Sequence, residues 1–476
     1  MSTTLLATDL DRDIQAVFTK QRQFAPQMAL TTAAQRIDRI KRLQTWVLAH
    51  QPALEKAMYD DFRKPTAEVG LGELMSVNAE IKHIIRNLKR WMRPQQLPTP
   101  LSLIGTRSSI RHEPKGNVLI FSAWNYPFAL LVKPLVSAIA AGNVCILKPS
   151  EMAPNTARFI SQMVQELFPV EEVAVFEGDA SVSQALLELP FNHVFFTGSP
   201  AVGKVVMAAA AKHLASVTLE LGGKSPSIVD ETANLKTAAE QIAWGKYLNN
   251  GQTCIAPDYV LVHESVKEPF LAEFRQVVKR MYNASEQGVE ASDSYARIVN
   301  NRHFQRIRSL LDDAIARGAR VTMGGRMNTD QNFIEPTVVE GVNDAMRIMQ
   351  EEIFGPLLPV VPFATADEAL ALINSKEKPL ALYIHSRSRR NIDYLMARTS
   401  AGDTIINDLM LQFGNVELPF GGVNNSGIGK SNGFFSFQEL SNQRGVMERN
   451  FGTMKFIYPP YTDRVRKLID FVVKRL

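Results

Sequence analysis

Apolar side chains in the first ninety positions recur at the spacing of amphipathic helices. Between Ala33 and His50 they fall every three or four residues, and the stretch from Glu68 to Trp91 repeats this spacing. The breaker-rich stretch from Arg93 to Pro100 interrupts the pattern. The sequence therefore predicts a helical beginning, and we expect residues 101–111 to form an extended arm.

The pattern changes at Gly116, where short apolar runs begin to alternate with helical stretches. The runs cover residues 117–122, 143–147, 173–176, 193–197, 217–221 and 227–229, and helices are expected at residues 128–140, 154–167, 181–188 and 201–214. This alternation predicts βαβ units around a parallel sheet, with ligands at the carboxyl ends of the strands. Beyond Gly222 the alternation resumes with different lengths, which predicts a second α/β domain ending near Asp403.

Composition places the chain among soluble globular proteins of two or three domains. It has 476 residues, of which 45% are hydrophobic and 21% are charged. The start of the chain shows no secretory signal, and no run of about 18 apolar residues occurs. Two cysteines, Cys145 and Cys254, make neither a disulfide framework nor a Cys-rich zinc site, which favours a reducing, cytoplasmic setting.

Most of the net charge of +5 lies in the last segment, Thr453 to Leu476, which carries six basic and two acidic residues. The rest of the chain is nearly neutral, which argues against a nucleic-acid-binding surface. The segment predicts a basic amphipathic helix, too short to cross a bilayer, with one apolar face formed by Val465, Leu468, Ile469, Val472 and Leu476. This helix either packs on protein or lies on an anionic membrane surface.

The sequence Asn250-Gly-Gln-Thr-Cys254 is the strongest local signal for chemistry. Gly251 provides a flexible turn before a single cysteine. A thiolate is a potent nucleophile, and a loop or helix start there would expose it and lower its pKa. The alternative is a buried and inert cysteine.

Two further polar residues stand at strand ends. Glu220 ends an apolar run and precedes two glycines, so partial desolvation would raise its pKa toward that of a general base. The alternative for Glu220 is an ion pair with Lys224 or a contact with solvent at the end of the strand. Asn125 follows the first parallel strand and can direct its amide at a developing oxyanion, or serve as a turn residue before Pro127.

The sequences at two other strand ends are typical of nucleotide binding. Gly198-Ser199 through Gly203 lie between a strand and a helix, where backbone N–H groups can hold a phosphate. The spacing matches a P-loop, but Val205 replaces the Mg²⁺-binding hydroxyl, so a pyrophosphate site fits better than an NTPase. Lys148 and Glu151 can address ribose hydroxyls, or form a surface ion pair.

These motifs together resemble the aldehyde dehydrogenase superfamily from about Ala33 to Tyr461. The motifs Glu351-Glu-Ile-Phe-Gly-Pro356 and Leu418-Pro-Phe-Gly-Gly422 support the same resemblance. The short N-terminus and the stretch Tyr458-Pro-Pro-Tyr461 are similar to the class 3 and fatty aldehyde dehydrogenase branch.

The resemblance implies roles for individual residues. Cys254 matches the catalytic nucleophile, Glu220 the general base, and Asn125 the oxyanion donor together with the backbone N–H of Cys254. The cofactor, NAD or NADP with NAD favoured by Glu151, would contact Trp124, Lys148, Glu151, Gly198, Ser199, Gly203, Leu221, Glu352 and Phe354. No metal site is expected. The substrate would be a small-molecule aldehyde, and the branch implies a homodimer.

The resemblance also implies a Rossmann-like cofactor domain, an α/β catalytic domain and a small oligomerisation arm. We place the NAD(P)-binding domain at residues 1–96 and 113–221 and the catalytic domain at residues 222–412. The arm would comprise residues 97–112 and 433–452, with a glycine-rich return segment at 413–432 and the basic tail at 453–476. Tyr126, Phe128 and residues 409–413 are candidates for an apolar tunnel that takes medium or long aliphatic or aromatic aldehydes.

Alternative functions remain open. A CoA-acylating relative would pass the acyl group to CoA, although Glu220 as a base for water argues against it. A non-catalytic binding protein on the same fold is a second alternative. A metal hydrolase has little support because no two histidines lie within five residues, and no GxSxG motif indicates a serine hydrolase.

Overall fold

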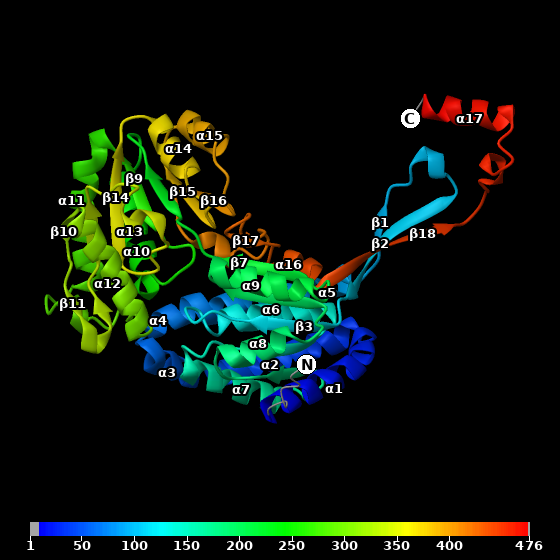
Figure 1. Cartoon of the computed structure of the whole chain (residues 1–476), viewed down its shortest axis with the longest axis horizontal. Coiled ribbons are helices and arrows are strands. Elements are labelled where there is room, and N and C mark those ends of the chain that lie inside the picture. Colours follow the sequence, from blue (N-terminus) through cyan, green and yellow to red (C-terminus); the bar gives the residue numbers. More distant parts are fainter. Residues whose placement is uncertain (1–8, 475–476) are drawn as a thin grey trace, which may run out of the picture.

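The computed structural model describes residues 9–474 as two α/β bodies lying side by side, with a β-arm projecting from one of them (Figure 1). The first body contains a six-stranded sheet in the order β17-β7-β6-β3-β4-β5, in which β17 (Gly427–Ile428) pairs antiparallel with β7. Its parallel strands are β3 (Asn117–Phe121), β4 (Val144–Lys148), β5 (Val173–Val175), β6 (His193–Gly198) and β7 (Ser216–Leu221). The connecting helices are α6 (Ala129–Ala141), α7 (Pro154–Leu167), α8 (Ala180–Leu187) and α9 (Pro200–Ala211). The predicted α/β class with a parallel sheet is confirmed.

The strand order of this sheet reverses at β3, which lies between β4 and β6. In open α/β sheets such a reversal opens a crevice at the carboxyl ends of the two diverging strands. Asn125 follows β3, and Gly198 with Ser199 ends β6. The topology therefore brings two of the predicted motifs to one crevice.

Helices precede this sheet, as the apolar spacing predicts. They are α1 (Asp9–Ala29), α2 (Ala33–Ala49), α3 (Gln51–Phe62), α4 (Thr66–Glu68) and α5 (Ser76–Trp91). The stretch from Glu68 to Trp91 is not one regular helix, because residues Val69–Met75 form a π-helical segment, η1. The apolar faces of α2 and α5 share one core with the fully buried helix α6.

The second body contains a seven-stranded sheet in the order β10-β13-β14-β9-β8-β15-β16. Its strands are β8 (Pro226–Val229), β9 (Tyr259–His263), β10 (Arg320–Met323), β13 (Thr337–Glu340), β14 (Leu357–Phe363), β15 (Ala381–His385) and β16 (Asp403–Ile406), with only β10 antiparallel. A separate ribbon pairs β11 (Met327–Asn328) with β12 (Phe333–Ile334). The helices are α10 (Leu235–Tyr247), α11 (Lys267–Tyr282), α12 (Asn301–Ala316), α13 (Arg347–Gln350), α14 (Ala366–Asn374) and α15 (Arg389–Met396). The apolar run at 227–229 belongs to this sheet, not to the first one.

The arm is a three-stranded antiparallel sheet of β1 (Gln95–Leu97), β2 (Thr106–Pro114) and β18 (Ser441–Arg449). Residues 433–452, expected as the second part of the arm, are only partly arm. Its first residues form α16 (Gly433–Glu439), which lies against the first body because Phe437 is buried beside Trp91, with ring centroids 5.5 Å apart. Residues 101–103 are a short 3₁₀ turn, η2 (Leu101–Leu103), rather than extended chain.

The tail leaves the arm as a 3₁₀ turn, η8 (Lys455–Ile457), followed by helix α17 (Asp463–Val473) (Figure 1). The predicted amphipathic helix is present, with Leu468, Ile469 and Val472 exposed. Arg475 and Leu476, which the prediction included, lie outside the described residues, as do residues 1–8. Across residues 9–474, no helix has the length and apolar character needed to span a membrane.

Candidate active site

Cys254 lies in a turn between α10 and β9, after a strained 3₁₀ segment, η3 (Leu248–Gly251). Asn249, Asn250 and Gly251 have φ of +51°, +58° and +73°. A Cβ on Gly251 would lie 2.4 Å from the carbonyl oxygen of Gly355, so glycine is required for close approach as well as for the turn. The left-handed conformation of the two asparagines costs conformational energy, and such strain gathers at functional sites.

Cys254 is the residue shared by two cavities. One cavity of about 820 Å³, here called the charged cavity, contains nine predicted site residues: Trp124, Asn125, Gly198, Ser199, Glu220, Leu221, Cys254, Glu352 and Phe354. The other, of about 200 Å³, is here called the apolar cavity, and no charged residue lines it. The half-buried thiol therefore separates a site for charged groups from a site for apolar ones.

Three predicted cofactor residues do not line the charged cavity. Lys148, at the end of β4, is buried and places Nζ 3.6 Å from the Glu151 carboxylate and 2.9 Å from the Pro149 carbonyl oxygen. Gly203 lies on α9, where a Cβ would be 2.8 Å from Cδ2 of Leu221. Gly203 therefore allows α9 to approach β7 closely, which is one role of glycine at nucleotide-binding turns.

Glu220 is buried near the end of β7, and Ser431 Oγ donates a hydrogen bond to its carboxylate. Burial raises the pKa of Glu220, while the Ser431 hydrogen bond and the Lys133 ammonium oppose the rise. The alternative ion pair with Lys224 is wrong, because Lys224 Nζ lies 3.1 Å from Asp258 and 2.8 Å from the Ile348 carbonyl oxygen. The net shift of the Glu220 pKa is upward, which is the direction that a general base needs.

Asn125 is buried where the chain leaves β3 for α6. Its backbone carbonyl accepts hydrogen bonds from Lys64 Nζ at 3.1 Å and from Asn249 Nδ2 at 2.9 Å. Its side-chain Oδ1 has no hydrogen-bond partner among residues 9–474. The backbone of Asn125 is therefore fixed, and its side chain borders the charged cavity beside Cys254.

The expected low pKa of Cys254 is wrong for this structure. Burial raises the pKa of the thiol, and the nearby Glu352 and Glu220 carboxylates raise it further. The turn supplies too little positive electrostatic potential to offset the cost of removing the thiolate from water. Formation of the thiolate therefore needs a change in surroundings, such as a bound cation, or a base.

Glu352 and Phe354 belong to the loop that follows α13. Burial and the Asp258 carboxylate raise the pKa of Glu352 to about 8, although the backbone N–H of Gly223 donates to its carboxylate. Gly222 also borders Glu352, because a Cβ there would lie 2.1 Å from its carboxylate oxygen. Phe354 has φ of +49°, and its ring lies 5.3 Å edge-on from that of Trp124.

Sequence reasoning missed several residues of the site. His303 lies in the charged cavity with its ring 5.0 Å from Trp124, and Arg306 holds the Glu352 loop by donating to the Glu352 carbonyl oxygen at 3.1 Å. Ser431 and Lys133 act near Glu220. No motif marks these residues, because each comes from a segment distant in sequence and meets the site only through the fold.

The structure places only some of the predicted tunnel residues at a cavity. Tyr126, Met410, Leu411 and Phe413 line the apolar cavity, and Tyr126 Oη lies 3.0 Å from Thr253 Oγ1. Phe128 and Leu409 are fully buried in the hydrophobic cores instead. Residues that the sequence did not indicate also line the wall, among them Leu71, Gly72 and Met75 of η1, with Trp244, Leu248 and Phe420.

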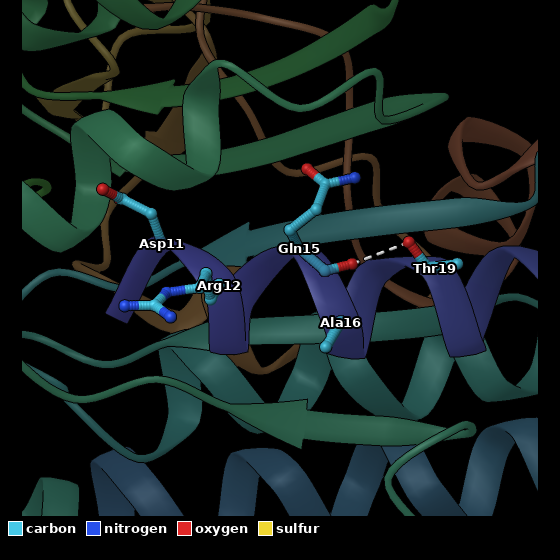
Figure 2. A pocket seen from close by; sticks show the side chains of 5 residues that line it. All are labelled: Asp11, Arg12, Gln15, Ala16 and Thr19. Carbon is cyan, nitrogen blue, oxygen red and sulfur yellow. Dashed lines mark hydrogen bonds between the residues drawn. The ribbon is translucent and has the colours of Figure 1, made fainter. Parts of the chain in front are cut away.

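A third hollow lies on α1, where Figure 2 shows Asp11, Arg12, Gln15, Ala16 and Thr19. Thr19 Oγ1 donates to the carbonyl of Gln15 at 2.8 Å. These residues come from one helix, and none of them borders the cavities at Cys254. We therefore assign this hollow no part in the chemistry.

Comparison with known proteins identifies the family of the chain. The profile of the Aldehyde dehydrogenase family matches residues 6–446. The chain is 40% identical over 437 residues to 4,4'-diaponeurosporen-aldehyde dehydrogenase of Staphylococcus aureus, covering 92% of this chain and 94% of that protein. It is 39% identical over 428 residues to aldehyde dehydrogenase family 3 member A2 of Macaca fascicularis, covering 89% and 87%. The chain belongs to the aldehyde dehydrogenase family, and its likeness to family 3 members confirms the predicted branch.

Solved structures give the same result for the fold. The substrate-bound state of Staphylococcus aureus AldH matches with a TM-score of 0.92 and 39% identity, over 96% of this chain and 99% of that one. PnpE in complex with nicotinamide adenine dinucleotide matches with a TM-score of 0.84 and 27% identity, over 93% and 90%. The protein is thus an aldehyde dehydrogenase, and NAD or NADP is the cofactor of this family.

The charged cavity fits a dinucleotide. Ser199 caps the N-terminus of α9, whose free N–H groups suit a pyrophosphate. Thr197 Oγ1, also at this cavity, is buried without a hydrogen-bond partner among residues 9–474. A ligand hydroxyl or phosphate oxygen would satisfy that hydroxyl group.

Proposed function

We propose that the enzyme oxidises an apolar aldehyde to its carboxylic acid through a thiohemiacetal and then a thioester on Cys254. The single observation that carries this proposal is that Cys254 borders both cavities. The aldehyde chain would occupy the apolar cavity, with its carbonyl carbon at the thiol. NAD or NADP in the charged cavity would accept the hydride that the substrate carbon loses.

The first step assigns roles to Cys254 and Asn125. The Cys254 thiol gives up its proton to solvent, the sulfur of the thiolate adds to the carbonyl carbon, and the electron pair of the C=O bond moves to oxygen. The Asn125 amide and the backbone N–H of Cys254 donate to that oxyanion. Loss of hydride from the carbon then restores the C=O bond as a thioester.

The second step assigns the base to Glu220. Its carboxylate removes a proton from water, the hydroxyl oxygen bonds to the thioester carbon, and the C–S bond breaks to release acid and thiolate. The raised pKa of Glu220 supports this role, because a stronger base takes the proton more readily. Hydrolysis is favoured over transfer to CoA because this base lies in the cavity beside Cys254.

The test is cofactor reduction with aldehydes from acetaldehyde to hexadecanal and benzaldehyde, with NAD and NADP separately. We expect turnover without CoA and kcat/KM rising with chain length. Turnover that requires CoA would instead favour the acylating alternative. No reduction by a folded, cofactor-binding protein would favour the non-catalytic one.

The preference for long apolar aldehydes rests on the wall of the apolar cavity, which Leu71, Met75, Tyr126, Leu411 and Phe413 help to form. The Staphylococcus aureus relative, 4,4'-diaponeurosporen-aldehyde dehydrogenase, is likewise named for an aldehyde substrate. NAD is favoured over NADP because Glu151, beside Lys148, would repel a 2′-phosphate.

A homodimer formed through the arm is part of the proposal. The arm and the chain that follows it expose Leu101, Ile104, Met447 and Phe451, which a partner subunit would cover. Sedimentation of the wild type should give twice the monomer mass. A Phe451→Glu variant should shift the protein toward monomer, whereas an unchanged mass would contradict this interface.

The tail is proposed to contact an anionic membrane surface. Helix α17 exposes Leu468, Ile469 and Val472, and Arg464 and Lys467 lie among them. Co-sedimentation with anionic liposomes should be lost when residues after Tyr461 are deleted. Binding that survives the deletion would contradict this role.

A further inference from the structure

The N-terminal helical segment contributes a buried ammonium to the active-site loops. Lys64 follows α3 and is fully buried, and its Nζ lies 2.7 Å from Oε1 of Glu73 in η1. The same ammonium donates to the carbonyl oxygen of Asn125 at 3.1 Å and lies 3.8 Å from the ring centroid of Tyr126. Burying an ammonium is costly, so such a pair persists only when its partners are well placed.

The segment also contacts the nucleophile loop. Glu68, buried in α4, accepts a hydrogen bond from the backbone N–H of Asn249 at 2.8 Å. Asn249 Nδ2 in turn donates to the same Asn125 carbonyl that Lys64 holds, and to the Gln252 carbonyl at 3.1 Å. The Asn125 carbonyl is thus the point at which the N-terminal segment and the Cys254 loop meet.

Glu73 fixes the other side of the Asn125 turn. Its Oε2 accepts a hydrogen bond from the backbone N–H of Ala129 at 2.7 Å, at the start of α6. Gly72 faces Tyr126 so closely that a Cβ would lie 2.6 Å from Cε1 of the ring. The π-helical η1 therefore places one carboxylate and one bare backbone surface against residues 125–129, and such helical irregularities often occur at functional sites.

We propose that Lys64 is a positioning residue of the reaction, which holds the Asn125 turn in place through its backbone carbonyl and fixes the Tyr126 ring. This inference rests on the proposed role of Asn125 as oxyanion donor. Lys64 does not line either cavity, so it acts only through the residues it holds. A displacement of about 1 Å in a catalytic group lowers the rate by up to roughly a hundredfold.

The experiment is a double-mutant cycle between Lys64→Met and Asn125→Ala, read as kcat with saturating cofactor and aldehyde. Lys64→Met should lower kcat by roughly tenfold to a hundredfold in the wild type. In the Asn125→Ala background it should lower kcat by less than about twofold, because the group it positions is gone. Lys64→Arg, which keeps a cation, should recover most of kcat.

Matched variants separate positioning from folding. Lys64→Met leaves Glu73 unpaired, so Lys64→Met with Glu73→Gln restores a neutral pair and should keep the thermal midpoint near the wild type while kcat stays low. Lys56→Met removes an equally charged but exposed lysine of α3, which pairs with Asp60, and should leave kcat unchanged. Alkylation of Cys254 by iodoacetamide should keep its wild-type rate in Lys64→Met, since the thiol itself is untouched.

The outcomes distinguish the two proposals. Equal losses of kcat from Lys64→Met in both backgrounds, or an unchanged kcat in the wild-type background, would overturn the positioning role alone. An unchanged kcat in Asn125→Ala would overturn the oxyanion assignment on which this inference rests.

Discussion

The two cavities at Cys254 differ in how their walls are built. The charged cavity is lined by strand ends of the first body and loops of the second, and it contains Glu220, Lys224, Arg306 and Glu352. The apolar cavity is lined by η1, the turn after β3 and the segment around Met410, without a charged residue. The redox and hydrolysis steps need charges at fixed positions, whereas an aldehyde chain needs only apolar surface.

Because of this difference, substitutions on the two sides should impair the activity of the enzyme in different ways. A change on the charged side should alter the rate of the chemical steps, because it displaces a group that transfers a proton or that holds the hydride acceptor. A change on the apolar side should alter the KM of long substrates and leave short ones alone. Cys254 borders both cavities, so its removal should abolish the oxidation of long and short aldehydes alike.

The largest effect is expected for Cys254→Ala. Removal of the proposed nucleophile should lower kcat by a factor on the order of 10⁴ or more, because the proposed covalent intermediate can no longer form. The measurement is cofactor reduction with a long-chain aldehyde. Cys145→Ala is the matched control, since Cys145 is buried in β4 away from both cavities. Normal turnover by Cys254→Ala would contradict the proposed thioester mechanism.

The next effect is expected for Glu220→Gln. Steady-state turnover should fall by roughly 10²- to 10⁴-fold because no base activates water. The first turnover should survive as a burst of about one reduced cofactor per active site, since the thioester still forms. Rapid-mixing kinetics measure both phases. Absence of the burst would show that Glu220 acts before the thioester.

On the apolar side, Met75→Glu should raise the KM of long-chain aldehydes by about tenfold through lost apolar contact. Met75 is 57% exposed, so the variant should fold normally. The KM values of acetaldehyde and of the cofactor should not change. Leu48→Glu, at an exposed site on α2 outside both cavities, is the control. An equal rise for acetaldehyde would contradict the division into two sides.

The smallest effect is expected for Ser431→Ala. Its hydrogen bond favours the Glu220 carboxylate and so holds the pKa down, and its loss should raise that pKa further. Glu220 acts as a base only when it is deprotonated. The pH below which activity is lost should therefore be higher in the variant than in the wild type. At neutral pH, kcat should fall by about fivefold, because one hydrogen bond contributes about 1 kcal/mol. A pH profile of kcat identical to that of the wild type would contradict this coupling.

The charged side of the site was largely predictable from sequence. Asn125, Gly198, Ser199 and Glu220 follow or end parallel strands, and the ends of such strands meet at one edge. Cys254 departs from this rule, because it precedes β9 at the amino end of the second sheet. Its motif identified it, but only the stacking of the two bodies brings it to the others.

The apolar side was less predictable. Phe128 and Leu409 have the same apolar character as Tyr126 and Leu411, yet the first two are core residues and the last two line the cavity. Hydrophobicity favours burial in either place, so the sequence does not separate a core from a cavity wall.

The sequence by itself determined the α/β class, the strand ends and the candidate residues for chemistry, because local periodicity and backbone constraints act over short stretches. The tertiary structure alone decided that Ser431 holds Glu220, that Lys64 reaches the Asn125 carbonyl, and that burial raises rather than lowers the pKa of Cys254. Each of these depends on segments far apart in the chain, and on how completely their contact excludes water.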